Sequence, residues 1–341
     1  MKKHILFLFI LAFIFSACSI FKGGKKVVTS ISFQYDPNSP INYGYKLPIK
    51  VIANFSNGKT KNITSKDDLL LTIKGATYSN GIIYCNSNPI RFQKDTIYLN
   101  ATYTKNKKIH KQSLILPFNY KGSLNFNYNG SRGKNGSDGG KGSTSLFFRH
   151  GKDGDAGLIG STGHVGHDLT VFIWKELSLY YVKLYDMTTD KTYYYKANDN
   201  TNFYNFNVFG GNGGNGGDGG KGGNGKDGAK TENKTKSPGS GGDGGIGGSG
   251  GNGGKGGNVY VFIHPNATGF QNKITTNNVG GTGGLAGGGG KGGLTGVTLE
   301  GQNSKDEGTT GQNGDNGLRG ASGDVINIEV QQFDIKDVKN N

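Results

Sequence analysis

Residues 210–228 read GGNGGNGGDGGKGGNGKDG, and residues 239–257 read GSGGDGGIGGSGGNGGKGG after a polar break of ten residues. Glycine recurs every third residue in both stretches, in two adjacent phases. A polyproline-II-type helix has three residues per turn and rises about 3.1 Å per residue, so this repeat places the glycines of one phase along one edge. Because glycine lacks a Cβ, a neighbouring backbone can approach that edge closely. The stretch predicts hydrogen-bonded polyglycine-II helices.

Glycine is concentrated in two parts of the chain. Of the 63 glycines among 341 residues, 12 lie in 130–166, 44 in 210–323 and only seven elsewhere. The remaining sequence is rich in Tyr, Phe, Ile and Val, so a uniformly low-complexity, disordered chain is excluded. We therefore expect an all-β protein, in which β-strands carry ordered glycine blocks.

The glycine-rich part is an internal repeat. Gly130 aligns with Gly210 at an offset of 80, and Gly151 aligns with Gly241 at an offset of 90. Each repeat is expected to consist of a strand, a glycine helix leading out, a loop, a glycine helix leading back and a strand. The repeats span about 124–174, 204–264 and 274–330. All strands should then lie at one end and the three loops, 143–150, 229–238 and 294–307, at the other.

The number of glycine phases predicts where each helix lies in a bundle. A helix with two glycine edges can be packed between neighbours, whereas a helix with one edge has room for one close neighbour. Helices with two phases, expected to be central, are 210–228, 239–257 and 280–293. Helices with one phase, expected to be peripheral, are 130–142, 151–166 and 308–323.

Residues 27–121 predict a β-sandwich. They alternate between apolar and polar side chains in seven or so short runs, and Asn57-Gly58 and Asn80-Gly81 are strong turn signals. The stretch VIANFSNGKTKNIT, residues 51–64, resembles the central hairpin of bacterial immunoglobulin-like domains of surface proteins. The expected organisation is thus an immunoglobulin-like sandwich over 27–121, a polyglycine-II bundle with an associated β-sheet base over 122–330, and a C-terminal tail over 331–341.

The N-terminus resembles that of bacterial lipoproteins. Lys2 and Lys3 precede an apolar run, which ends in Phe15-Ser16-Ala17-Cys18, a lipobox-like tetrapeptide. The resemblance implies a signal peptide over 1–17, a lipidated tether over 18–26 and a lipid anchor on Cys18 in the outer membrane. The abundance of Asn, Lys, Ile and Tyr resembles Bacteroidota proteins, whose surface lipoproteins often carry an acidic export signal. Because the tether here is basic, the cell surface and the periplasmic face both remain open.

The charge of the chain is uneven. Residues 19–129 hold 16 Lys and Arg against four Asp, a net charge of +12. Such a region next to a lipid anchor favours anionic lipid or lipopolysaccharide head groups. A merely solvated lysine-rich surface is the alternative. Nucleic acid is disfavoured, because the lipobox directs the chain out of the cytoplasm and no recognition motif is visible.

No pattern of catalytic residues stands out. There is no spaced Ser-His-Asp or Cys-His arrangement, and Cys85 has no cysteine partner in the mature chain except the lipidated Cys18. His164 and His167 would lie about 9 Å apart along a polyproline-II helix, too far apart for one metal ion. Alternation in a strand favours core packing over a carbohydrate platform for Tyr193–Tyr195. We expect no enzymatic activity, no cofactor and no metal.

The glycine blocks resemble collagen superficially, but they lack proline and are interrupted every 13 to 19 residues. Calcium-binding nonapeptide repeats are disfavoured by the period of three. Polyglycine-II bundles with polar breaks resemble the receptor-binding tip adhesins of T-even-like phages and the snow flea antifreeze protein. An ice-binding face would need small residues where this chain has Asn, Asp and Lys. The phage resemblance implies binding through the distal loops, with candidate residues Phe147, Phe148, Arg149, His150, Lys230, Lys234, Lys236, Leu294 and Leu299.

Two functions follow from these observations. The first is a non-enzymatic outer-membrane lipoprotein that presents loops on a rigid glycine bundle for surface binding or adhesion, with a surface glycan or an envelope protein as partner. The alternative is a structural subunit of an envelope transport, secretion or motility complex, with the immunoglobulin-like domain making the contact.

The lipobox generates the first prediction. Cys18→Ala should abolish acyl labelling and release the exported protein into the soluble fraction, because the anchored thioether can no longer form. Metabolic labelling with a clickable fatty acid, followed by fractionation, measures both effects. A labelled, membrane-bound Ala variant would show that the lipobox interpretation is wrong.

Overall fold

The computed structural model describes residues 26–144, 149–301 and 306–340. The structure consists mainly of β-strands with few helices, which confirms the expected all-β class. Among these residues, no helix combines the length and the apolar character that crossing a bilayer requires. The chain divides into two compact units, Met1–Gly122 and Ser123–Asn341, called here the N-terminal and the C-terminal unit and described separately.

The N-terminal unit contains three three-stranded sheets, β1-β3-β4, β2-β7-β6 and β5-β8-β9. Nine strands are described, where the sequence predicted about seven. Their bounds are β1 (Val28–Gln34), β2 (Lys46–Pro48), β3 (Lys50–Phe55), β4 (Thr60–Asn62), β5 (Leu69–Lys74), β6 (Ala76–Ser79), β7 (Ile82–Cys85), β8 (Thr96–Lys105) and β9 (Lys108–Pro117). The expected turn at Asn80-Gly81 joins β6 to β7, and both residues have positive φ, 49° and 79°, as a two-residue type I′ hairpin requires.

Strand β8 links the apolar cores of the N-terminal unit. Its alternate residues Ile97 and Leu99 pack with Leu47 and Ile83 in one buried cluster. The next two inward residues, Ala101 and Tyr103, belong to a second cluster with residues of β1 and β3. The period of two that the sequence shows therefore places one face of β8 in the core. Cys85 lies in the first cluster, where burial raises the pKa of its thiol to about 11.

Besides a two-stranded hairpin in one loop, the described part of the C-terminal unit has two larger sheets, which separate the outgoing from the returning strands of the repeats. The outgoing strands β10 (Gly122–Asn127), β14 (Thr201–Asn207) and β18 (Ile274–Asn277) form one sheet. The other sheet has the order β13 (Lys191–Ala197), β12 (Leu179–Asp186), β11 (Leu169–Glu176), β17 (Val259–Ile263) and β19 (Ile326–Val330). Phe126 on β10 lies 4.8 Å from Tyr195 on β13, measured between ring centroids, so side chains of the two sheets share a core.

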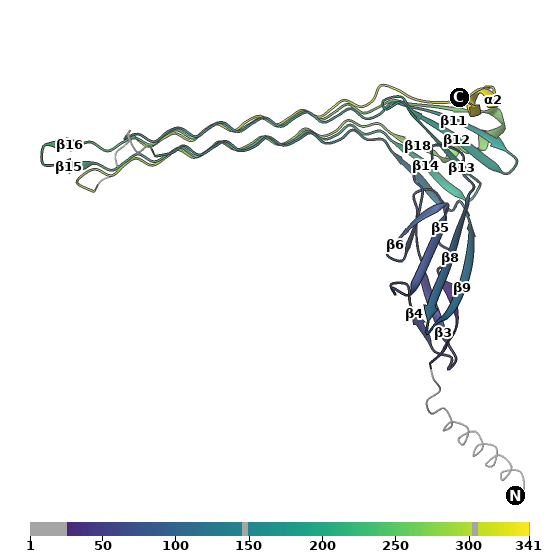
Figure 1. Ribbon diagram of the computed structural model, residues 1–341. Coiled ribbons are helices and arrows are strands. Elements are labelled where there is room, and N and C mark those ends of the chain that lie inside the picture. The colour runs from purple at the N-terminus through teal and green to yellow at the C-terminus, as the bar shows by residue number, and fades with distance from the viewer. Residues whose placement is uncertain (1–25, 145–148, 302–305, 341) are drawn as a thin grey trace, which may run out of the picture. The chain divides into compact units, whose positions relative to one another are not determined.

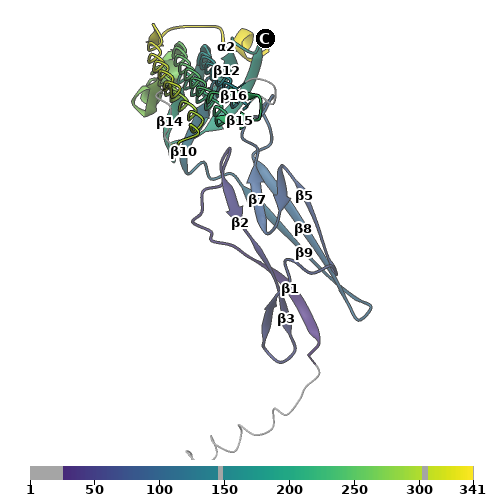
Figure 2. The same ribbon diagram turned by 90° about the vertical axis from the view of Figure 1, so that its left-hand side faces the viewer.

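Six glycine-rich stretches extend from these sheets (Figure 1). We number them one to six in chain order and call them the glycine segments: 130–142, 151–166, 210–228, 239–257, 280–293 and 308–323. Figure 2 views them end-on from the loop end. Segments one, three and five continue the outgoing sheet as parallel neighbours, and segments two, four and six continue the returning sheet. Hydrogen bonds between the two layers run antiparallel, for example from Gly245 N to Gly220 O and from Gly248 N to Gly217 O, both at 2.8 Å.

The hydrogen bonds correct one expectation about position. Within the described residues, segments three and four bond to four other segments each, as expected of central segments, but segments two and five bond to three each. Segment five, expected to be central, thus occupies the same kind of edge position as segment two. The number of glycine phases does not equal the number of neighbours, because a single glycine edge lies in the groove between two neighbouring segments and contacts both. A Cβ on Gly133 would meet both Ser161 O, at 2.0 Å, and Gly214 N, at 2.9 Å.

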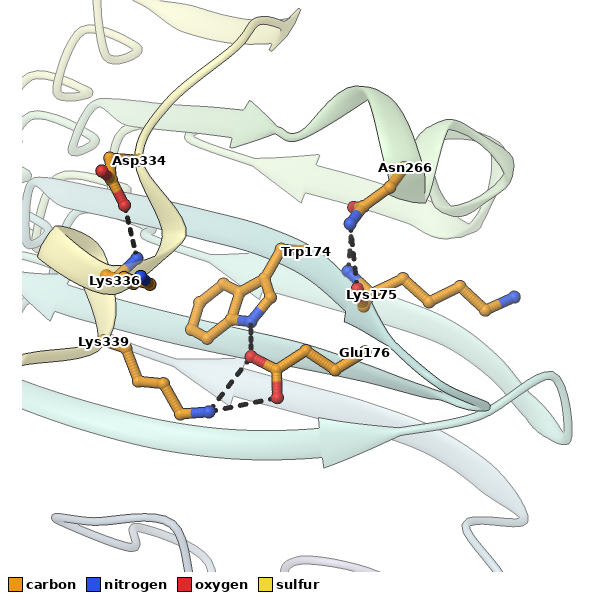
Figure 3. A network of polar contacts seen from close by, with 7 residues as sticks. All are labelled: Trp174, Lys175, Glu176, Asn266, Asp334, Lys336 and Lys339. Carbon is orange, nitrogen blue, oxygen red and sulfur yellow. Dashed lines mark hydrogen bonds and ion pairs between the residues drawn. The ribbon is translucent and has the colours of Figure 1, made fainter.

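The C-terminal tail includes a short helix that the sequence did not predict, α2 (Ile335–Asn340). Lys339 Nζ lies 3.1 Å from both carboxylate oxygens of Glu176, whose Oε1 also accepts a hydrogen bond from Trp174 Nε1 at 3.0 Å (Figure 3). The largely buried Lys183 donates to Val338 O at 3.0 Å. These contacts fix the tail against the β11–β12 part of the returning sheet.

The packed glycine edges generate a stability prediction. A Cβ on Gly247 would lie 2.1 Å from Gly287 O, so Gly247→Ala forces segments four and five apart and should cost about 1–3 kcal/mol of unfolding free energy. The side chain of the adjacent Ile246 is 55% exposed, and Ile246→Ala should change the unfolding free energy by less than about 0.5 kcal/mol. Thermal or urea unfolding compares the two. Equal stability of both variants would contradict the requirement for a bare glycine edge.

Candidate binding site at the distal loops

A short hairpin forms the loop between segments three and four, at the end of the segments opposite the sheets (Figure 1). Strands β15 (Ala229–Thr231) and β16 (Lys234–Lys236) pair antiparallel, with Ala229 opposite Lys236 and Thr231 opposite Lys234. Every residue of the hairpin is exposed. The hairpin is therefore a projection whose side chains are available to a partner.

The three candidate lysines of this loop are divided between the faces of the hairpin. Side chains alternate along a strand, so Lys234 and Lys236 share one face and Lys230 lies on the other. None of the three forms an ion pair with another residue of the described ranges. The hairpin thus presents cationic groups on both faces, with only Glu232 as a carboxylate in its own sequence.

The third loop places two leucines beside the hairpin. Leu294 and Leu299 are 55% and 53% exposed. Leu294 is fixed through its backbone, because its N–H donates to Asn224 Oδ1 at 3.1 Å and its carbonyl accepts from Gly225 N at 2.9 Å. Gly228, at the base of the hairpin, donates to Val297 O at 2.8 Å. Aliphatic and cationic candidate residues are in this way held at one end of the segments.

Two other candidates are engaged in contacts between segments. A guanidinium nitrogen of Arg149 donates to Asp227 O, and the Arg149 carbonyl accepts from Lys226 N at 2.9 Å. His150 Nδ1 lies 2.7 Å from Ser240 Oγ. Both side chains therefore hold the start of segment two against its neighbours, a structural role. Phe147, Phe148 and Cys18 lie outside the described residues.

The structure gives each histidine of the HVGHD stretch a separate partner. His164 Nδ1 lies 2.8 Å from Ser131 Oγ, and His167 Nδ1 lies 2.8 Å from Asp186 Oδ2. The parts of the chain that the structure describes contain no cluster of three His, Cys, Asp or Glu side chains suited to a metal ion.

Asp186 is a residue whose role the sequence analysis missed. Asp186 is only 1% exposed, and its buried carboxylate is hydrogen-bonded. It accepts from Thr188 N at 3.1 Å and from Thr189 Oγ1 at 2.6 Å, and it also contacts His167. These contacts close the turn after β12 and join it to the end of segment two. An aspartate followed two and three residues later by threonines is the local sequence signal for such a turn.

The sequence analysis also missed the role of Asn and Asp at the third position of the glycine triplets. Each of the two layers of segments has one face against the other layer and one outer face. Backbone N–H groups that point to an outer face meet no further segment of the described chain that could accept their hydrogen bonds. Asn135 Oδ1 accepts from Asn215 N at 3.0 Å, and Asn215 Oδ1 in turn accepts from Leu285 N at 3.1 Å. On the opposite face, Asp243 Oδ1 accepts from Thr309 N at 2.7 Å. Short polar side chains thus satisfy backbone donors of the next segment in the same layer.

Comparisons with protein-family models, with curated proteins and with solved structures find no match to this chain.

The Asp243 contact generates a pH prediction. Hydrogen bonds from Thr309 N and then Thr309 Oγ1 lower the pKa of Asp243 below its usual 3.8. A lowered folded-state pKa gives stability that is present above the unfolded-state value and lost as the pH falls through the folded-state value. Asp243→Asn keeps an acceptor oxygen but does not titrate, so the melting-temperature advantage of the wild type over this variant should shrink between pH 6 and pH 2.5.

Asn252→Ser is the matched control, because Asn252 Oδ1 accepts a hydrogen bond from Leu318 N at 2.8 Å, again between segments four and six, and neither an amide nor a hydroxyl side chain titrates in this range. The difference between wild type and this variant should stay constant over the same pH range. A constant difference for Asp243→Asn as well would show that its hydrogen bonds do not favour the ionised form.

Proposed function

We propose that this chain is a non-enzymatic outer-membrane lipoprotein that presents its distal loops to a partner on a rigid scaffold. The glycine segments are polyglycine-II helices in this proposal, and the N-terminal unit is an immunoglobulin-like sandwich. The observation that carries the proposal is the hydrogen bonding of the segments, which repeats every three residues along their whole length and ends at exposed loops.

The period of three supports the helix type. Gly133, Gly136, Gly139 and Gly142 each donate to segment three at 2.8 Å, as expected when successive turns of a three-residue helix face the same neighbour. A segment such as 210–228 spans about 60 Å at about 3.1 Å per residue. Backbone hydrogen bonds to neighbours in several directions make the bundle of segments stiff. The loops are therefore held far from the sheets of their own unit.

The loop residues support a binding role at that end. Lys230, Lys234 and Lys236 are exposed cations, and Leu294 and Leu299 are exposed aliphatic side chains at the same end of the segments. A few residues near the centre of an interface carry most of its binding energy, so a small group of loop side chains is sufficient for recognition. The partner that fits is an acidic surface glycan or an envelope protein with an acidic patch. Contact through the N-terminal unit, as in a structural subunit of an envelope complex, is the competing outcome.

A loop variant tests the proposal. We expect Lys230→Gln, Lys234→Gln, Lys236→Gln and Leu299→Ser, combined in the mature Cys18→Ala chain, to weaken binding to intact cells and to arrayed bacterial surface glycans at least tenfold. The matched control carries Lys134→Gln, Lys141→Gln, Lys221→Gln and Leu158→Ser, which change equally exposed residues along the segments. The control should bind like the parent, and both variants should melt within about 2 °C of it.

Unchanged binding by the loop variant would overturn the adhesive role. Protease treatment of intact cells then separates the two functions, because a bundle displayed for adhesion is cleaved at the exposed hairpin. Full protection of the hairpin on intact cells, with cleavage after the outer membrane is opened, would support a periplasmic structural subunit.

A further inference from the structure

The N-terminal unit contains an open cavity of about 1040 Å³ between two of its sheets. One wall comes from the sheet β2-β7-β6, the other from the sheet β5-β8-β9, and the connection between β7 and β8 closes one side. The volume is at the upper end of the range typical of small-molecule sites. The cavity belongs to this unit alone and shares no residue with the distal loops.

Each sheet contributes one lysine and one tyrosine to the cavity as a cross-strand pair. Lys46 on β2 lies opposite Tyr84 on β7, and its Nζ is 5.5 Å from the centre of the tyrosine ring. Lys74 on β5 lies opposite Tyr98 on β8. Residues directly opposite in antiparallel strands project from the same face of the sheet. Two separate sheets thus present the same pair of side chains to one space.

The charge of the cavity is one-sided. Arg91 and Lys94, from the connection between β7 and β8, join Lys46 and Lys74 in its lining, and none of the Asp and Glu residues that the structure describes lines it. None of these four cations forms an ion pair with the rest of the described chain. Like charges around one cavity repel each other and attract an anion.

A second cavity of the same unit shows that this arrangement is not a general consequence of the high lysine content. It measures about 590 Å³ and is also lined by several lysines, but Asp67 and Asp68 line it too. Asp68 forms an ion pair with Lys105 at 3.5 Å. The second cavity is thus partly neutralised from within, whereas the first lacks any internal counter-charge.

We infer that the larger cavity binds an acidic saccharide. The rings of Tyr84 and Tyr98, with Phe92, supply apolar surface on which the C–H face of a sugar ring packs. Asn86 Oδ1 accepts a hydrogen bond from Asn88 N at 3.0 Å, which leaves the amide nitrogen of Asn86 to donate to a hydroxyl group. Arg91 can bind a carboxylate or a phosphate with two parallel hydrogen bonds. A free inorganic anion would use the cations but neither the aromatic surface nor most of the volume.

Titration calorimetry on the mature Cys18→Ala chain tests this inference with defined probes. An octamer of galacturonate carries carboxylates, a phosphorylated maltooligosaccharide carries phosphate, and maltooctaose is the neutral control. At least one acidic probe should bind with a Kd below about 1 mM, at least tenfold tighter than maltooctaose. Tyr98→Ala should weaken saccharide binding about fivefold and leave the response to inorganic phosphate unchanged.

A pair of charge-matched variants locates the site. Lys46→Gln, Lys74→Gln, Arg91→Gln and Lys94→Gln together should lower affinity at least tenfold. Lys59→Gln, Lys61→Gln, Lys108→Gln and Lys111→Gln remove the same charge from exposed positions outside the cavity and should change affinity less than twofold. If the first variant is unstable, Lys74→Gln alone, at an exposed position, should still lower affinity at least threefold.

Three results would overturn the inference: no acidic probe binding below 1 mM, equal binding of maltooctaose, or equal loss of affinity in both charge variants. The last result would indicate diffuse attraction to the basic surface of the unit. The variant of the distal loops should bind these probes like its parent, so failure at one site can be told apart from failure at the other.

Discussion

The close approach of backbones along bare glycine edges is the constraint on which the C-terminal unit depends. A Cβ at nearly every glycine of the segments would lie about 2 Å from a carbonyl oxygen of a neighbour. Large apolar side chains of the segments, such as Leu158, Ile246 and Leu285, are exposed, so hydrogen bonds, each worth about 0.5–1.5 kcal/mol net, hold the segments together. The register of the parallel segments relative to one another has to be set by another part of the structure. The sheets supply it, because Tyr204 pairs with Ile274 at the offset of 70 that also relates Asn212 to Thr282 further out.

Much of this architecture could be read from the sequence, because the glycine phase and the repeat are local patterns. They predicted the strand, segment, loop, segment and strand order that the structure has. They failed for segment five, since the count of glycine edges in one segment does not reveal how many neighbours share each edge. They also gave no sign of α2, whose six residues are held by Glu176 and Lys183, more than 150 residues earlier in the chain.

The candidate sites show the same division between local and distant information. The sequence identified exposed loops and their residue types, but it could not show that Arg149 and His150 are used by Asp227 and Ser240, 78 and 90 residues away. It showed a net charge of +12 over residues 19–129 without showing that four of the cations surround one cavity. That arrangement depends on the pairing of β2 with β7 and of β5 with β8, which only the folded chain fixes.

The constant register between parallel segments restricts how the gene can change. One or two codons inserted into a segment would turn the glycine edge away from its groove and direct side chains into it over the rest of that segment. Three codons restore the phase, but the added turn finds partners only if the adjoining segments gain one as well. A change in segment length that keeps every contact therefore requires nine added bases in each of several segments, whereas a loop can lose or gain single codons without changing the phase. Residues that face each other on neighbouring parallel segments are 80, 90, 70 and 66 positions apart in the four pairs of segments. These unequal offsets are consistent with connections whose length can vary.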